Sequence, residues 1–186
     1  MSETATRSYR EPFAASVRRG LPQVWATGAG DGLSAVFGWG ERFRASATGP
    51  ARFAELADAF AAHAAGRADN PLAFVTVAFA DSSAAESVLV VPEVVGRWHA
   101  GTLRVDGPVP PPQPEHDFEE LDLRPGQLSR EGFRRAVSAA VGRIERGELE
   151  KVVLARDLEA SGPDPLDIPA LLARLLEANP QSWTFH

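Results

Sequence analysis

Hydrophobic and polar residues alternate in short runs through the first 105 residues, with glycine, serine and aspartate between the runs. This pattern is typical of β-strands joined by tight turns. It predicts strands at 33–37, 42–47, 72–79, 87–91, 97–100 and 102–105. Between the second and third strands, apolar residues recur every three to four positions from Phe53 to Ala64, which predicts one helix between Pro50 and Gly66. Residues 1–20 are expected to be a polar lead-in. Residues 1–105 are therefore interpreted as a β-rich section with one helix, arranged as an antiparallel meander.

Residues 106–128 show neither pattern. The prolines between Pro108 and Pro114 exclude a helix interior or a central strand from this stretch. We interpret 106–128 as a proline-rich linker. Residues 129–186 then predict a helix that Ser129 caps and Gly147 ends, a strand at 150–156, a helix at 166–178 and the start of a strand at 181–186. No partner for this last strand follows it in the sequence, so we expect further chain or another molecule to pair with it.

Composition narrows the classes of function. A net charge of −6 offers no basic surface for nucleic acid, and the absence of cysteine excludes disulfides, thiolate metal sites and a cysteine nucleophile. The chain shows neither a signal peptide nor an apolar run long enough to span a bilayer, so we expect a cytoplasmic protein without nucleic-acid or membrane partners. Its four histidines show no metal-ligand spacing.

Lys151 is the one candidate for chemistry. It begins the otherwise apolar strand predicted at 150–156, and period-two geometry places it on one face with Val153 and Ala155. In a buried sheet the ammonium would be desolvated, which favours the neutral amine that can accept a proton. The alternative is a strand-end lysine whose charge reaches water. The pattern alone leaves both interpretations open.

Two motifs resemble the chorismate-utilising enzyme family. They are Ile144-x-x-Gly147-x-Leu149-x-Lys151-Val-Val-Leu-Ala-Arg156 and Asn179-Pro180-x-Ser182-Trp183-x-Phe185. The resemblance is greatest to the isochorismate synthases of that family, and weaker features extend it back to about Gly32. It implies an α+β fold of antiparallel sheets flanked by helices, with Mg²⁺ and chorismate bound in a cleft. It also implies that Lys151 is the catalytic general base that activates the water attacking C2 of chorismate. Relatives that use ammonia carry glutamine at the matching position, so the lysine favours water as the nucleophile.

The family's general acid, magnesium-binding glutamates and carboxylate-binding residues have no counterpart up to His186. The resemblance thus implies an incomplete, amino-terminal half of the fold, with 129–186 as a truncated start of the catalytic section. We expect the 186 residues alone to be inactive, and Mg²⁺ to be required only by the full-length enzyme.

Two alternatives stay open. A salicylate synthase fragment shares the lysine, and a non-catalytic α+β binding or assembly module would keep Lys151 solvated. The sequence leaves the pathway, siderophore or menaquinone biosynthesis, undecided, together with the oligomeric state.

Overall fold

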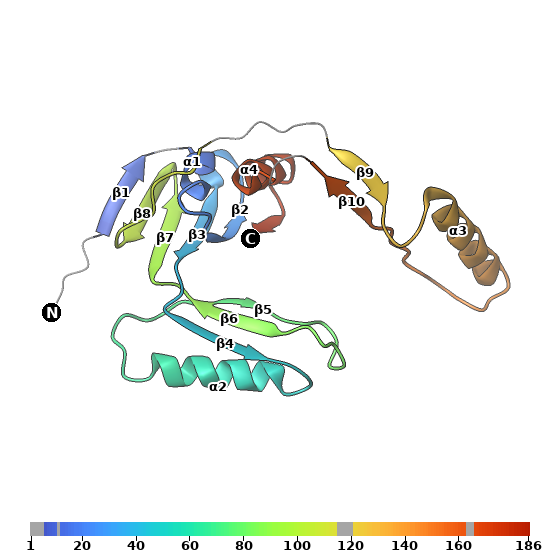
Figure 1. Ribbon diagram of the computed structural model, residues 1–186, viewed down its shortest axis with the longest axis horizontal. Helices are drawn as coiled ribbons and strands as arrows, with labels where there is room; N and C mark the ends of the chain where they lie inside the picture. The colour runs from blue at the N-terminus through green and yellow to red at the C-terminus, as the bar shows by residue number, and fades with distance from the viewer. Residues whose placement is uncertain (1–5, 11, 115–120, 163–165) are drawn as a thin grey trace. The chain divides into compact units, whose positions relative to one another are not determined.

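The structure, a computed structural model, describes residues 6–10, 12–114, 121–162 and 166–186. Its described strands form three sheets in which every neighbouring pair runs antiparallel. Helices pack against the two larger sheets (Figure 1). The predicted α+β class, with antiparallel sheets flanked by helices, is therefore confirmed.

The chain divides into two compact units, one made of Met1–Glu115 with Ile168–His186 and the other of His116–Asp167. This division differs from the predicted one at 1–105, 106–128 and 129–186, because the carboxy-terminal residues fold with the first section. Residues 115–120 of the predicted linker lie outside the described residues. Other parts of that linker are structured, since Pro112 forms a β-bridge with Arg19.

A six-stranded sheet organises the first unit, with strand order β1-β8-β7-β3-β2-β11. Its strands are β1 (Thr6–Arg10), β2 (Gln23–Thr27), β3 (Ser34–Trp39), β7 (Val94–His99), β8 (Thr102–Asp106) and β11 (Trp183–Phe185). The expected lead-in at 1–20 is wrong where it is described, because β1 pairs with β8 and a helix follows it. The strand predicted near 181–186 has a partner within the chain, since Phe185 lies opposite Trp25 of β2.

One face of this sheet carries the main core. Helices α1 (Phe13–Val17) and α4 (Ile168–Ala178) contact each other and contribute Val17 and Leu172 to it. Phe37 of β3 is fully buried there, and its ring stacks on Trp39 at 5.5 Å between centroids. Residues at the start and the end of the sequence therefore share one core, which explains why the carboxy-terminal helix and strand belong to the first unit.

The first unit also holds a three-stranded sheet of order β4-β6-β5, packed on the helix α2 (Arg52–Ala64). The strands are β4 (Phe43–Ala47), β5 (Phe74–Thr76) and β6 (Ser87–Val91). The predicted helix is confirmed, and its Leu56 is buried against the sheet. The strand expected at 72–79 is shorter than predicted, since only Phe74–Thr76 pairs with β6.

A buried arginine begins α2. The Arg52 side chain is 3% exposed, and it donates hydrogen bonds to the carbonyl oxygens of Ala78 at 2.8 Å, Gly49 at 2.7 Å and Phe79 at 3.0 Å. It also pairs with the carboxylate of Asp81 at 2.5 Å. One cation thereby joins the start of the helix to the loop that leads from β5 to β6.

The second unit contains a two-stranded sheet, β9 (Asp122–Pro125) with β10 (Leu158–Ser161), and the helix α3 (Arg130–Glu145). The helix begins as predicted, because the Ser129 hydroxyl accepts a hydrogen bond from the amide of Gly132 at 3.0 Å. It also ends as predicted: Gly147 has φ of 71°, its amide binds the Ile144 carbonyl, and the amide of Glu148 binds the Arg143 carbonyl. These two bonds form a Schellman motif.

The strand predicted at 150–156 is wrong in this structure. Residues 151–157 form neither helix nor strand, and pairing begins only at Leu158, opposite Pro125. A strand needs a neighbour for its amide and carbonyl groups, and none of the described residues lies opposite 150–156. The apolar pattern of 150–156 predicted a strand, but the described residues supply no partner strand for it.

The cap of α3 gives a first testable prediction. Replacing Ser129 by alanine removes the hydroxyl acceptor and should destabilise this unit by about 1 kcal/mol. Ser138→Ala, in the exposed middle of the same helix, is the matched control and should change stability little. Urea unfolding followed by far-ultraviolet circular dichroism measures both. Equal effects of the two changes would contradict the capping role.

Candidate active site

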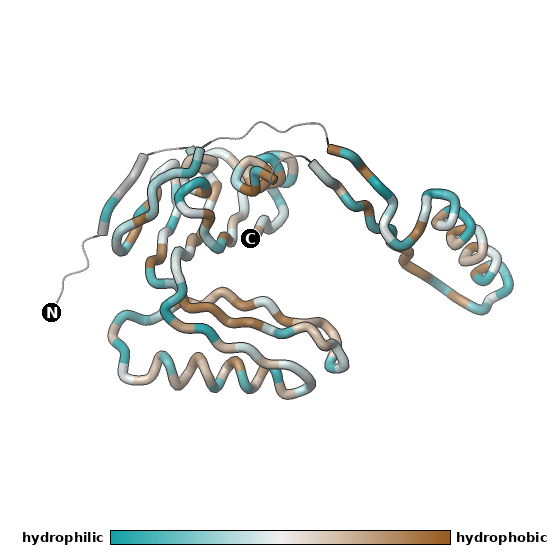
Figure 2. Tube along the Cα trace, viewed as in Figure 1, coloured by the Kyte–Doolittle hydropathy of each residue, from teal (hydrophilic) through white to brown (hydrophobic). Residues whose placement is uncertain are grey.

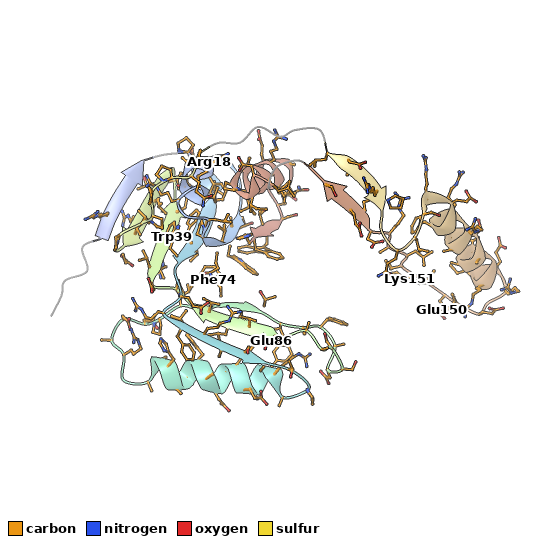
Figure 3. The ribbon with its side chains drawn as sticks, in the orientation of Figure 1. Arg18, Trp39, Phe74, Glu86, Glu150 and Lys151 are labelled. Atoms are coloured by element: carbon orange, nitrogen blue, oxygen red, sulfur yellow. The ribbon has the colours of Figure 1, made fainter. Side chains whose placement is uncertain are left out.

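Lys151 lies on the exposed segment that follows α3, next to Glu150 (Figure 3). Its side chain is exposed, and no described residue forms an ion pair or hydrogen bond with it. Its neighbour Val153 is 82% exposed, whereas Val152 and Leu154 are 39% and 38% exposed. The exposed fraction of the side chains thus alternates from one residue to the next, as it does in a strand, although no strand forms.

The end of α3 fixes where this segment begins. Glu148 accepts hydrogen bonds from Arg146 at 2.6 Å and from Arg143 at 3.1 Å. The bond from Arg146, and then that from Arg143, hold the pKa of the Glu148 carboxyl below its ordinary value. Together with the turn at Gly147, this charged cluster follows the end of α3 at Glu145, six residues before Lys151.

The solvated position of Lys151 affects its chemistry. A lysine acts as a general base only through its neutral amine, which burial favours. The burial expected of Lys151 in a sheet is absent, because no described residue pairs with 150–156. A catalytic role for Lys151 therefore needs a further layer of polypeptide over residues 150–156.

A compositional signal also distinguishes this residue. Lys151 is the only lysine in the sequence, whereas the other 18 of the 19 basic residues are arginine. A guanidinium stays protonated in proteins, so arginine cannot replace a lysine that must give up its proton. The one residue among these 19 that is not arginine thus occupies the position to which the resemblance assigns the general base.

The first unit holds an aromatic cavity of about 500 Å³. Trp25 and Phe185 stack at its wall with centroids 5.7 Å apart, and Phe74 of β5 also lines it. The buried Oε1 of Gln23 has no hydrogen-bond partner among the described residues. Apolar walls of this kind suit an uncharged or aromatic group better than a small dicarboxylate.

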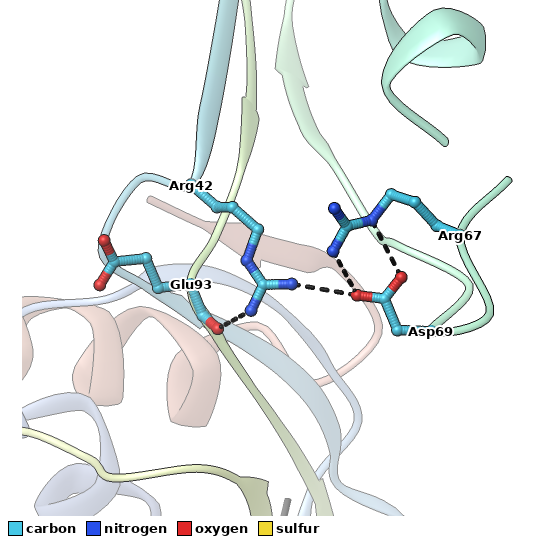
Figure 4. A network of polar contacts seen from close by, with 4 residues as sticks. All are labelled: Arg42, Arg67, Asp69 and Glu93. Atoms are coloured by element: carbon cyan, nitrogen blue, oxygen red, sulfur yellow. Dashed lines mark hydrogen bonds and ion pairs between the residues drawn. The ribbon is translucent and has the colours of Figure 1, made fainter. Parts of the chain in front are cut away.

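A smaller cavity of about 260 Å³ is polar and includes Arg42, Asp69 and Glu93. Figure 4 shows that Arg42 donates to the Asp69 carboxylate at 3.0 Å and to the Glu93 carbonyl at 2.8 Å. Arg67 also donates to Asp69, and this hydrogen bond holds the pKa of the Asp69 carboxyl below its ordinary value. Because Arg42 already binds two acceptors, this network does not offer a ready site for an anionic substrate.

Lys151 was the only site residue predicted from the sequence, so the structure brings no predicted constellation together. Among the described residues, no three histidine, aspartate or glutamate side chains are grouped so that they could hold a metal ion. None of the described helices has the length and apolar character needed to cross a membrane.

Comparison with known proteins bears directly on the segment around Lys151. The model of the chorismate binding enzyme family matches residues 110–186, which include Lys151, α4 and β11. The chain resembles the chorismate-binding enzymes. It is also 34% identical over 116 residues to the isochorismate synthase DhbC of Bacillus subtilis. That alignment covers 62% of this chain and 27% of the relative, so the chain spans well under half of the relative's length.

The resemblance predicted from the two motifs is thereby confirmed, since both lie inside the range that matches the chorismate-binding enzymes. No solved structure matches the chain. The comparisons do not assign a role to any residue, and the catalytic role of Lys151 stays a prediction.

Proposed function

We propose that this chain is part of an isochorismate synthase that converts chorismate to isochorismate. The observation that carries the proposal is the match of residues 110–186 to the chorismate binding enzyme family, together with the resemblance to an isochorismate synthase. Chorismate is then the small-molecule substrate. The product would serve siderophore or menaquinone biosynthesis in the cytoplasm.

In the proposed reaction Lys151 acts as the general base. Its neutral amine takes a proton from water as the water oxygen forms a bond to C2 of chorismate. The two conjugated double bonds of the ring each shift one position toward C4, the bond between C4 and its hydroxyl group breaks, and that hydroxyl leaves as water with a proton from an acid. Water is consumed and released, so the reaction is an isomerisation. A positioned base of this kind contributes roughly 10²–10⁴-fold to the rate.

We also propose that the complete enzyme requires Mg²⁺, which would neutralise carboxylate charge on the substrate. The described residues do not fit such an ion, because they contain no suitable group of three ligands. The ligands therefore have to come from outside the described part of this chain, and no step of the reaction above passes through the metal.

One observation favours a second candidate function. A non-catalytic binding or assembly module predicts a solvated Lys151, and Lys151 is exposed in this structure. In that case Lys151 would be a surface residue and the segment 150–156 a contact for another polypeptide. A salicylate synthase remains a variant of the first proposal that differs only in its final product.

The test is to express the open reading frame that contains these 186 codons and to incubate its product with chorismate and Mg²⁺. We expect isochorismate, identified by chromatography against an authentic standard, and no turnover from the 186-residue chain alone. Salicylate as the only product would replace isochorismate synthase by salicylate synthase. If the product of the reading frame leaves chorismate unchanged, the catalytic proposal is wrong and the module is favoured.

A further inference from the structure

The segment 150–156, which contains Lys151, connects the two ends of the helix α3. Figure 1 shows the chain turning back after this helix and returning to β10. The helix has 16 residues. At 1.5 Å per residue it is about 24 Å long. The way in which each end of the segment is attached to α3 therefore decides how the residues between them can lie.

Glu148 attaches the first end to the carboxy-terminal turn of α3. One of its carboxylate oxygens accepts a hydrogen bond from Arg146 at 2.6 Å, and the other accepts one from Arg143 at 3.1 Å. The amide of Glu148 also donates to the carbonyl oxygen of Arg143 at 3.0 Å. Both the backbone and the side chain of this residue are thus bound to the end of the helix.

Asp157 attaches the second end to the residues that precede α3. The Gln127 amide donates to its carboxylate, at 3.0 Å from Oδ1 and 3.2 Å from Oδ2, and the Gly126 amide donates to its carbonyl oxygen at 3.2 Å. The carboxylate lies so close to Gly126 that a β-carbon at this position would overlap it. Gln127 lies two residues before Ser129, which caps α3, so this attachment is at the opposite end of the helix.

The two attachments require an extended chain between them. The nine steps from residue 148 to residue 157 span at most roughly 30 Å when the chain is extended, but only about 14 Å as a helix. Figure 2 shows hydrophobic residues along this stretch, and Val153 is 82% exposed. Apolar side chains in water favour burial, so the segment has no preference of its own for this extended, exposed form. The attachments at its ends impose it.

We propose that Asp157 is a positioning residue for Lys151, with Glu148 as its counterpart at the other end of the segment. The two carboxylates hold 150–156 extended along α3, so the Lys151 amine keeps a fixed place relative to the helix. A catalytic group that is misplaced by about 1 Å can lose about 10²-fold in rate. This inference rests on the proposed function, because Lys151 is the base that the two residues would position.

Backbone mobility tests the attachment without any substrate. Nitrogen-15 relaxation of the 186-residue chain measures the order parameters of the amides in 150–156, with the amides of α3 as the reference for a folded unit. We expect about 0.8 in the unmodified chain and less than about 0.6 in Asp157→Ala. Asp157→Asn should stay near the higher value, because its amide oxygen still accepts a hydrogen bond from the Gln127 amide. Glu159→Ala, an exposed carboxylate on β10, is the matched control and should change nothing.

Kinetics of the full product of the reading frame test the role in catalysis. Asp157→Ala should lower kcat at least tenfold and change the KM for chorismate less than twofold, and Asp157→Asn should recover most of the loss. Ser129→Ala weakens the same unit but keeps both attachments, so its kcat should be unchanged. In a Lys151→Ala background, Asp157→Ala should cause no further loss, because its effect passes through the amine.

Three results would overturn the proposal. The first is a segment whose order parameters are the same in Asp157→Ala as in the unmodified chain. The second is an unchanged kcat in Asp157→Ala while Lys151→Ala is inactive. The third is an equal loss from Asp157→Ala with and without Lys151, which would show a purely structural role. All three leave the proposed function intact. Full activity of Lys151→Ala would instead refute the base itself, and the positioning role with it.

Discussion

Replacing Lys151 by alanine in the active product of the reading frame is expected to lower the rate of isochorismate formation roughly 10²–10⁴-fold. The amine is the group that we propose to accept the proton of the attacking water, and alanine offers no acceptor. The loss should appear in kcat, because a base acts on the transition state more than on the binding of chorismate. Steady-state kinetics with purified variants, followed by chromatography of isochorismate, measures the effect.

Lys151→Arg is the matched variant for this prediction. It keeps a positive charge and a similar length, but a guanidinium does not release its proton in proteins. We expect it to be as inactive as Lys151→Ala, with the same thermal unfolding temperature as the unmodified protein. Activity retained by the arginine variant and lost by the alanine variant would assign Lys151 a purely electrostatic role. Activity retained by both would remove it from the catalytic site.

The helices could be predicted from the sequence because their signals are local. The apolar stripe of α2, the Ser129 hydroxyl and the turn at Gly147 each act within a few residues of the element that they define. Their bounds in the structure differ from the expected ones by only one or two residues. The five-residue α1 was missed because it is too short to show a helical period.

The strand partners could not be predicted, because pairing is decided by residues far apart in sequence. Phe185 lies opposite Trp25 of β2, and nothing near either residue encodes that choice. Apolar alternation marks a segment as able to pair but does not say with what. Residues 183–185 pair with the strand β2 of the same chain, whereas residues 150–156 pair with none of the described strands.

The candidate site shows the same limit. Lys151 could be singled out because its motif and its place in an apolar run are properties of the sequence. The solvent exposure of Lys151 depends on which polypeptide covers residues 150–156, and no local sequence pattern encodes that polypeptide. The aromatic cavity in the first unit was also missed, because Trp25, Phe74 and Phe185 come from three separate strands.

Arg52→Ala is expected to destabilise the first unit by about 2–4 kcal/mol. The buried guanidinium binds three backbone carbonyl oxygens, and alanine leaves these buried acceptors without donors. The pair with Asp81 adds less to this cost, since that carboxylate is 70% exposed and can be hydrated. Thermal and urea unfolding of the purified chain measure the loss. Chymotrypsin should also cleave after the exposed Phe79 faster than in the unmodified protein, because its loop is no longer held to α2.

Two variants separate the hydrogen bonds from the charge. Arg52→Lys keeps a cation, but its single ammonium cannot reach three carbonyl groups that a guanidinium fork spans, so it should recover only part of the lost stability. Arg44→Ala removes an exposed arginine whose pair with Glu41 lies at the surface, and it should change stability by less than about 0.5 kcal/mol. If Arg52→Ala were as stable as Arg44→Ala, the loop would be held by its own packing and Arg52 would not join it to the helix. Full recovery by lysine would instead show that charge, and not the hydrogen-bond geometry, holds the loop in place.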